Sequence, residues 1–265
     1  MIRAFSYGGG VQSTAALVLA ARGEIDFPLF LFANVGEDSE HPDTLRYVEQ
    51  VAVPYAREKG IELLELRKRL RDGSTQTLME RIEKSETSIP IPVRMGENGA
   101  PGNRTCTAEF KIRVVQKEVR RRGATKERRA IIGLGISTDE WQRAKTADDP
   151  RSPYQLREYP LLDLNLDRQD CLNVIADEGL PQPGRSSCFY CPFHSLEEWR
   201  KLARTRPDLF AKACALEEKL HERGQRLGRG EFFMTRFGMK LPLIVDTEQQ
   251  VLFEDDGCES GYCMT

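Results

Sequence analysis

Three consecutive glycines flanked by hydroxyl residues form the segment of this chain best suited to bind an anion. Glycines let backbone N–H groups approach a phosphate closely, and a helix that begins directly after them adds partial positive charge at its N-terminus. The hydroxyls of Ser6, Ser13 and Thr14 are further donors. The segment reads Ser6-Tyr7-Gly8-Gly9-Gly10-Val11-Gln12-Ser13-Thr14. It predicts a phosphate cradle.

The spacing excludes two familiar phosphate loops. A Walker A loop ends in Gly-Lys-Ser/Thr, and this segment holds no lysine. The dinucleotide spacing G-x-G-x-x-G is absent as well. The cradle therefore belongs to another kind of nucleotide site, and a plain strand-to-helix turn is the alternative interpretation.

Polar residues follow a second apolar run. Asn34 and Gly36 come directly after residues 28–33, so they are expected beside the cradle, where a nucleotide base or ribose would lie. Glu37 and Asp38 are next. They either bind Mg²⁺ through water or cap and solvate the loop.

A third polar group follows the apolar residues 129–134. Gly135 lets the backbone approach a ligand, and Arg143 offers a fixed fork of donors for phosphate oxygens. Glu140 either orients Arg143 or binds magnesium. A surface ion pair at helical spacing is the alternative for these two side chains.

The cysteines form the other chemical group. They number seven, and the chain starts without a signal-peptide pattern, which favours thiolate chemistry or metal ligation over a disulfide framework. Cys188 and Cys191 have the spacing with which two thiolates grip one metal centre. Cys171 and Cys214 lie in apolar helical stretches and are predicted to be buried, inert thiols.

Further thiolates are needed to complete such a centre. Cys106 lies in a long loop, and Cys258 and Cys263 lie in the tail. A set of four thiolates would bind either structural zinc or a [4Fe–4S] cluster. That set would consist of Cys106, the Cys188/Cys191 pair and one tail cysteine. If Cys106 is instead catalytic, three ligands remain, and one iron would be open to hold a sulfide.

Alternating strand and helix patterns position these groups. Such alternation is typical of a doubly wound α/β fold with a mostly parallel sheet, whose ligands gather at the carboxyl ends of the strands. Strands are expected at residues 2–5, 28–33, 61–66, 129–134 and, shorter, 159–162, with helices after residue 10 and at 44–59, 108–122 and 168–178. Periodicity stops between residues 85 and 104, which predicts a long functional loop or lid.

The length of 265 residues fits one nucleotide-binding domain, residues 1–183, and a small cysteine-bearing helical appendage, residues 184–265, that ends in a short hairpin. A net charge of −2 argues against a globally basic nucleic-acid binder. Basic residues around 117–129 form either a local nucleic-acid surface or a solvated helix face. No apolar run approaches the roughly 20 residues that span a bilayer, so a cytoplasmic protein without membrane contact is expected.

The three polar segments, taken in chain order, resemble those of the PP-loop ATP pyrophosphatases and the related phosphoadenylylsulfate reductases. The glycine segment resembles their SGGxxS loop, and the segment from Gly133 to Arg143 resembles their G-I-x-x-x-E-x-x-R signature. The resemblance spans most of residues 2–200 and implies an adenine nucleotide alpha hydrolase-like fold. An acidic residue commonly stands at the position of Asn34 in that superfamily, so the asparagine weakens a metal role there.

The cysteine segments resemble a narrower group, the sulfur-transfer members such as the ATP pyrophosphatases of DNA phosphorothioation. The resemblance implies an iron–sulfur cluster, with Cys263 favoured over Cys258 as fourth ligand. It also implies that Ser13, Lys111, Glu140 and Arg143 serve catalysis. ATP, with Mg²⁺, would adenylate an acceptor and release pyrophosphate, and sulfur from a cysteine desulfurase or from the cluster would displace AMP.

Two rival functions stay open at this stage. Reduction of adenylyl sulfate or its 3′-phosphate form uses the same fold, but the adjacent Cys-Cys pair of its cluster-bearing members is absent from this sequence. A non-catalytic nucleotide-binding scaffold with structural zinc is the other. The acceptor, whether DNA, transfer RNA or a small metabolite, and membership of a modification complex also stay open.

Overall fold

The computed structural model describes residues 1–95, 100–149 and 152–246. These form two compact units: Met1–Thr77 with Thr107–Ser187, and Leu78–Cys106 with residues 188–246. The division expected from the sequence, residues 1–183 and 184–265, differs in the later boundary, which follows Ser187, and in one segment. Leu78–Cys106 belongs to the second unit, because a short strand within it pairs with a strand near residue 232.

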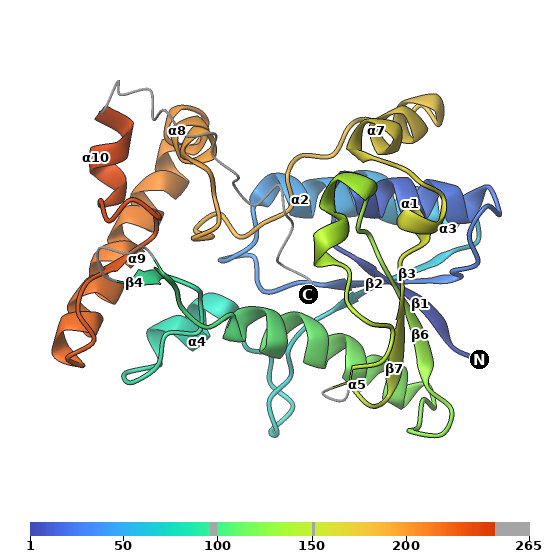
Figure 1. Cartoon of the computed structure of the whole chain (residues 1–265), viewed down its shortest axis with the longest axis horizontal. Coiled ribbons are helices and arrows are strands. Elements are labelled where there is room, and N and C mark those ends of the chain that lie inside the picture. Colours follow the sequence, from blue (N-terminus) through green and yellow to red (C-terminus); the bar gives the residue numbers. More distant parts are fainter. Residues whose placement is uncertain (96–99, 150–151, 247–265) are drawn as a thin grey trace. The chain divides into compact units, whose positions relative to one another are not determined.

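The first unit is built on five parallel strands in the order β3-β2-β1-β6-β7 (Figure 1). They are β1 (Arg3–Tyr7), β2 (Leu29–Ala33), β3 (Glu62–Leu66), β6 (Ala130–Leu134) and β7 (Gln155–Glu158). The chain runs from β1 outward to β3 and then returns to the other side of β1. The doubly wound fold is therefore confirmed, with its topological switch point between β1 and β6.

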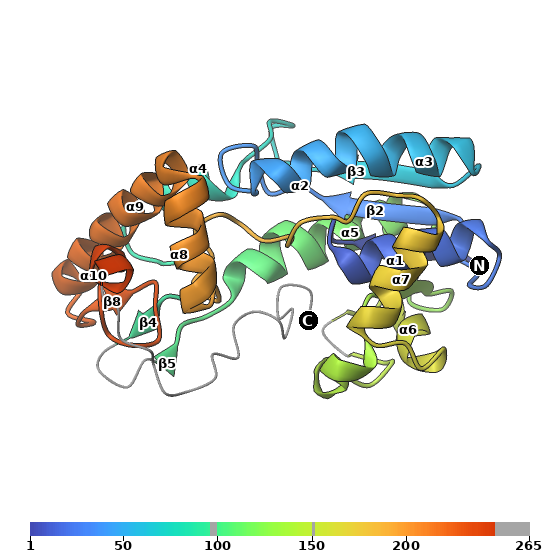
Figure 2. The same ribbon diagram turned by 90° about the horizontal axis from the view of Figure 1, so that it is seen from above.

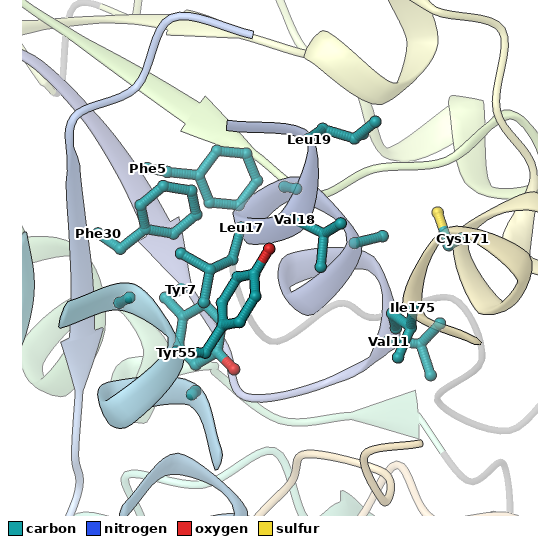
Figure 3. Close-up of a cluster of buried hydrophobic side chains, with 14 of the residues drawn as sticks. Phe5, Tyr7, Val11, Leu17, Val18, Leu19, Phe30, Tyr55, Cys171 and Ile175 are labelled. Carbon is teal, nitrogen blue, oxygen red and sulfur yellow. The ribbon is translucent and has the colours of Figure 1, made fainter. Parts of the chain in front are cut away.

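Helices cover both faces of this sheet (Figure 2). Phe5, Tyr7 and Phe30 point from the strands toward one face, where they pack in a cluster with Val18 and Ile175 (Figure 3). Alternate strand residues point to the other face, as the pleat requires. The first face carries α1 (Val11–Ala21), α7 (Arg168–Asp177) and one continuous helix made of α2 (Pro42–Tyr47), η1 (Val48–Ala52) and α3 (Val53–Glu58). The second face carries η2 (Thr107–Ile112) and α5 (Arg113–Arg121).

The strand expected at residues 159–162 is wrong. The strand is β7, which ends at Glu158, and Pro160–Asp163 forms the short helix α6. Proline has no N–H for a strand ladder, and its fixed φ suits the first turn of a helix. Pro160 therefore ends the strand and starts the helix.

The second unit consists of helices and a small sheet. Residues 85–104, expected as a loop or lid, contain the short strands β4 (Arg94–Met95) and β5 (Ala100–Pro101), and β4 pairs with β8 (Phe232–Phe233). The end of the chain, where a hairpin was expected, lies outside the described residues. Its helices are α4 (Leu78–Glu83), α8 (Leu196–Thr205), α9 (Pro207–Arg226) and α10 (Leu241–Asp246). Within the described ranges, no helix combines the length and apolar character that crossing a bilayer requires.

Candidate functional site

The glycine loop, residues 8–10, joins β1 to α1 at the switch point. Gly9 has a φ of 78°, and a Cβ added there would lie 2.8 Å from Thr44 Cγ2. A Cβ on Gly10 would lie 2.7 Å from Ser186 Oγ. Gly9 therefore requires glycine, whereas the close neighbour of Gly10 is a hydroxyl that can rotate. The loop leads into the first turn of α1, whose N–H groups have no carbonyl partner within the helix.

The three hydroxyls expected in the cradle have different positions. Gly10 N–H donates to Ser13 Oγ at 3.1 Å, and Ser13 Oγ donates to the Gly10 carbonyl at 3.0 Å, so Ser13 fixes the loop. The Thr14 hydroxyl lies 3.1 Å from the Tyr7 hydroxyl in the core. Ser6 faces the α5 side of the sheet. Of the three, Ser13 is the hydroxyl held in the loop itself.

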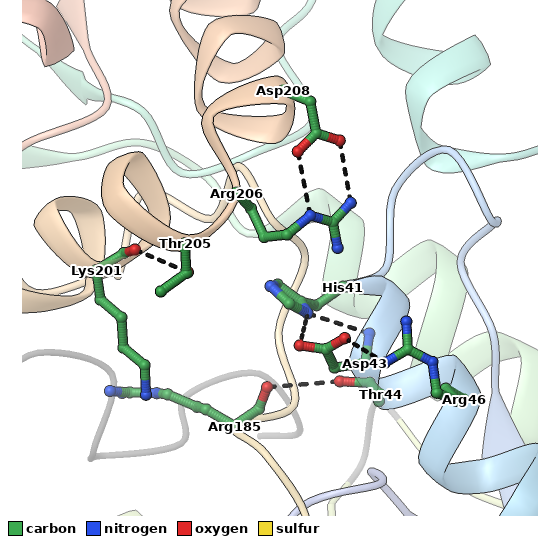
Figure 4. A network of polar contacts seen from close by, with 9 residues as sticks. All are labelled: His41, Asp43, Thr44, Arg46, Arg185, Lys201, Thr205, Arg206 and Asp208. Carbon is green, nitrogen blue, oxygen red and sulfur yellow. Dashed lines mark hydrogen bonds and ion pairs between the residues drawn. The ribbon is translucent and has the colours of Figure 1, made fainter.

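Ser186 also borders the glycine loop, and the sequence analysis missed it. Its segment is tied to the start of α2. Thr44 Oγ1 donates to the Arg185 carbonyl at 3.4 Å (Figure 4), and His41 N–H donates to the Ser187 carbonyl at 3.2 Å. The adjacent hydroxyls Ser186 and Ser187, directly before Cys188, were the available signal.

Asn34 shapes the loop after β2. It is 3% exposed; its Oδ1 accepts from Gly36 N–H at 2.8 Å, and its Nδ2 donates to Glu65 at 3.1 Å and Glu37 at 3.4 Å. Arg67 bonds both carboxylates, and its hydrogen bond is the main cause of a lowered pKa at Glu37. The Asn34 amide is thus hydrogen-bonded to protein groups. A ligand in this region would contact the backbone around Gly36, which Asn34 holds in place.

The carboxylates considered for magnesium are engaged in the same way. Asp38 accepts hydrogen bonds from Ser39 Oγ at 2.9 Å and Thr77 Oγ1 at 2.7 Å, while Glu37 is paired with Arg67. Across the described ranges, no three His, Cys, Asp or Glu side chains are grouped to hold a metal ion. Capping of the loop is therefore the role that these contacts support.

The loop after β6 meets the glycine loop and the start of α1. A Cβ on Gly135 would lie 3.4 Å from Ser13 N, and Gln12 Nε2 donates to Ser137 Oγ at 3.4 Å. The short helix η3 (Thr138–Arg143) follows. The cradle and the Gly135 segment, predicted separately from the sequence, are thus adjacent.

Glu140 and Arg143 form a buried ion pair in η3. Glu140 is 5% and Arg143 6% exposed. Burial raises the pKa of Glu140, and the attraction of Arg143 partly offsets this. Of the two roles expected for Glu140, holding the arginine is the one that this pairing supports.

Lys111 lies on the opposite face of the sheet from α1. It lines a hollow together with Ser6, Leu134, Gln155 and Arg157, next to the carboxyl ends of β1 and β6. Lys111 and Ser6 are therefore neighbours, although the sequence assigned them to separate elements.

Three of the four predicted metal ligands, Cys106, Cys188 and Cys191, belong to the second unit. Cys191 N–H donates to the Cys188 carbonyl at 3.1 Å, which closes a turn, and Cys106 N–H donates to the Pro90 carbonyl at 2.7 Å. Cys258 and Cys263 lie outside the described residues. The donor set suits iron–sulfur or zinc chemistry, but the described residues do not gather three such ligands around one point.

Cys171 and Cys214 are expected to react slowly with alkylating reagents. Burial raises the pKa of Cys171 to about 12 and that of Cys214 to about 11. Because the thiolate is the nucleophile, about one Cys171 thiol in ten thousand is reactive at pH 8, and the rate should rise tenfold per pH unit toward pH 12. Peptide mass spectrometry after timed iodoacetamide treatment measures this. Modification of Cys171 as fast as free cysteine at pH 8 would contradict it.

Three arginines of the basic cluster near residues 117–129 form ion pairs. Arg121 and Arg122 both donate to Glu118, and Arg122 also pairs with Glu62. Arg129 pairs with Asp148. These contacts favour the solvated helix face over a nucleic-acid surface.

The sheet order and the glycine loop at its switch point define a doubly wound α/β protein with a nucleotide-type loop. No family model and no curated protein matches the chain. Among solved structures it is similar to the U34-tRNA thiolase NcsA from Methanococcus maripaludis with its [4Fe-4S] cluster, at 14% identity and a TM-score of 0.41, over 87% of this chain and 73% of that one. A likeness of this degree assigns no activity to the chain.

Proposed function

We propose that this chain is an ATP pyrophosphatase of the PP-loop kind, which adenylates an acceptor for sulfur incorporation. The observation that carries the proposal is the glycine loop: Gly9, with its φ of 78°, cannot be replaced without backbone strain and a clash, and the loop lies at the switch point against Gly135. Helix N-termini and glycine loops at that point of a doubly wound sheet are suited to phosphates.

In the proposed reaction, an acceptor oxygen attacks the α-phosphorus of ATP. The bond from that phosphorus to the bridging oxygen breaks, and pyrophosphate leaves toward the glycine loop. Backbone N–H groups and Ser13 hold the leaving group, and Arg143, oriented by Glu140, offsets its charge. Lys111, beside Ser6, is the second cation assigned to the phosphates.

Sulfur incorporation completes the reaction. The outer sulfur of a persulfide from a cysteine desulfurase attacks the activated atom of the acceptor, and AMP departs with the electron pair of the broken bond. A thiol then attacks the resulting disulfide and releases the thiolated acceptor. Cys188, Cys191 and Cys106, with Cys263 as fourth ligand, are proposed to bind an iron–sulfur cluster, or zinc in its place. The adenylation step does not depend on that centre.

Incubation with ATP, transfer RNA or DNA oligonucleotides, and a sulfide source tests the proposal, with nucleotides separated by chromatography. We expect AMP and pyrophosphate in equal amounts, and their loss in Ser13→Ala. ADP as the product would contradict the mechanism. Binding of ATP without turnover would favour the scaffold, and thiol-dependent conversion of adenylyl sulfate to sulfite would favour the reductase.

Iron, sulfide and zinc analysis of protein purified without oxygen tests the metal centre separately. Cys188→Ala is expected to lose the metal, whereas Cys214→Ala, in a helix of the same unit, should keep it. Equal metal content in both variants would remove Cys188 from the ligand set.

A further inference from the structure

Trp141 is an exposed indole at the rim of the candidate site. It lies in η3, and 63% of its surface is exposed, whereas its neighbours Glu140 and Arg143 are buried. Tryptophan combines a large apolar ring with a polar N–H and is enriched at binding surfaces, so an indole exposed beside the glycine loop is a candidate contact for a ligand. The proposed adenylation chemistry gives this side chain no role.

The turn that carries Trp141 is fixed on both sides. Glu140 N–H donates to the Ser137 carbonyl at 3.0 Å, and Ala144 N–H donates to the Trp141 carbonyl at 2.9 Å. Tyr159 holds the next residue: its hydroxyl donates to the Lys145 carbonyl and accepts from the Lys145 N–H, each at 2.9 Å. The backbone therefore presents the indole in a defined position, which lowers the entropy lost on binding.

The same turn contacts α1, the helix that follows the glycine loop. Ser137 accepts from Gln12 at 3.4 Å, and the Asp139 carboxylate accepts from the Arg168 backbone N–H at 3.1 Å. The Arg168 side chain reaches back to Gln12 Oε1 at 3.5 Å. A guanidinium thus lies between the cradle and the turn that bears Trp141.

The surroundings of Trp141 indicate what it binds. A protein partner needs a broad apolar patch, but the exposed residues that follow in sequence include Gln142, Lys145 and Thr146, which are polar. A nucleobase needs a single aromatic face and nearby cations for its phosphates. We infer that Trp141 stacks on an unpaired base of a nucleic-acid acceptor, with Lys145 and Arg168 toward its backbone. This inference rests on the proposed function and narrows its substrate to single-stranded or looped nucleic acid.

Fluorescence tests the stacking directly, because the chain has two tryptophans and Trp199 is fully buried in the second unit. A twelve-nucleotide single-stranded RNA should quench the exposed indole of the wild type, and the quenching should be absent in Trp141→Phe. Anisotropy of the labelled RNA should show roughly tenfold weaker binding by Trp141→Ala and little change in Trp141→Phe, which keeps an aromatic ring.

Leu243→Ala is the matched control, because Leu243 is 57% exposed on α10; its RNA affinity should equal that of the wild type. Equal affinity of wild type and Trp141→Ala, or equal binding of a duplex without unpaired bases, would overturn the inference. The AMP assay separates the two ideas. If the wild type forms AMP and Trp141→Ala binds RNA as tightly as the wild type, only the stacking inference is wrong. If Trp141→Ala binds RNA more weakly but the wild type forms no AMP, only the proposed pyrophosphatase activity is wrong.

Discussion

Replacing Gly9 with valine is expected to lower the conversion of ATP to AMP by at least roughly 100-fold, the effect of removing one oxyanion-type donor. The φ of 78° at Gly9 disfavours a β-branched residue, and the new Cβ would meet Thr44 Cγ2 at 2.8 Å and Val48 Cγ2 at 3.4 Å. The glycine loop can relieve this clash only by moving away from α2, which carries Thr44. Its N–H groups then no longer converge on the leaving pyrophosphate.

Gly23→Val is the matched control for this experiment. Gly23 has a φ of 75°, and a Cβ added there would meet nothing within 4 Å. It carries the same backbone strain, at the far end of α1, without the clash. We expect a loss of unfolding free energy of about 1 kcal/mol and normal turnover. Turnover by Gly9→Val within threefold of Gly23→Val, at equal folded fraction by circular dichroism, would show that the glycine loop is not the phosphate site.

Local sequence patterns predict most of the first unit. The apolar residues of β1 and β2 are buried on both faces of the sheet, as Phe5 and Phe30 illustrate, and continuous apolar runs are typical of parallel strands. The glycine loop is equally local, since strand, turn and helix are contiguous. Its position at the switch point and the fold class therefore follow from the sequence.

Long-range pairing limits what the sequence predicts in the second unit. The two-residue strands β4 and β8 pair Arg94 with Phe233 and Met95 with Phe232, and strands of that length leave no periodic pattern. Leu78–Cys106 was therefore expected in the wrong unit. Only the pairing of residues far apart in the chain reveals where this segment belongs.

The same limit applies within the site. Asn34 has the residue type of a ligand-binding amide, but its bond to Glu65 depends on the register of β2 against β3. Ser186 reaches the glycine loop from a segment that follows α7. The i,i+3 pair Glu140 and Arg143 could be predicted because both lie on one helical turn, whereas its burial depends on the tertiary structure.

That burial makes Glu140→Gln the substitution with the largest expected effect on stability. The amide removes the negative charge that pairs with the Arg143 guanidinium, which is only 6% exposed. Breaking one side of a buried pair costs about 3 kcal/mol, which urea unfolding would measure. Glu218→Gln is the control, because Glu218 forms an exposed pair with Lys240, and its unfolding midpoint should be nearly unchanged.

A double variant separates the structural role of the pair from its role in turnover. Glu140→Leu/Arg143→Met removes both charges, and apolar replacement of a buried pair is often neutral or stabilising, so the unfolding free energy should return to within about 1 kcal/mol of the wild type. If Arg143 offsets charge on pyrophosphate, this stable protein still forms AMP at least roughly 100-fold more slowly. A stable double variant with normal AMP formation would mean that the pair serves only the local structure of η3, and Lys111 would then be the remaining cation assigned to the reaction.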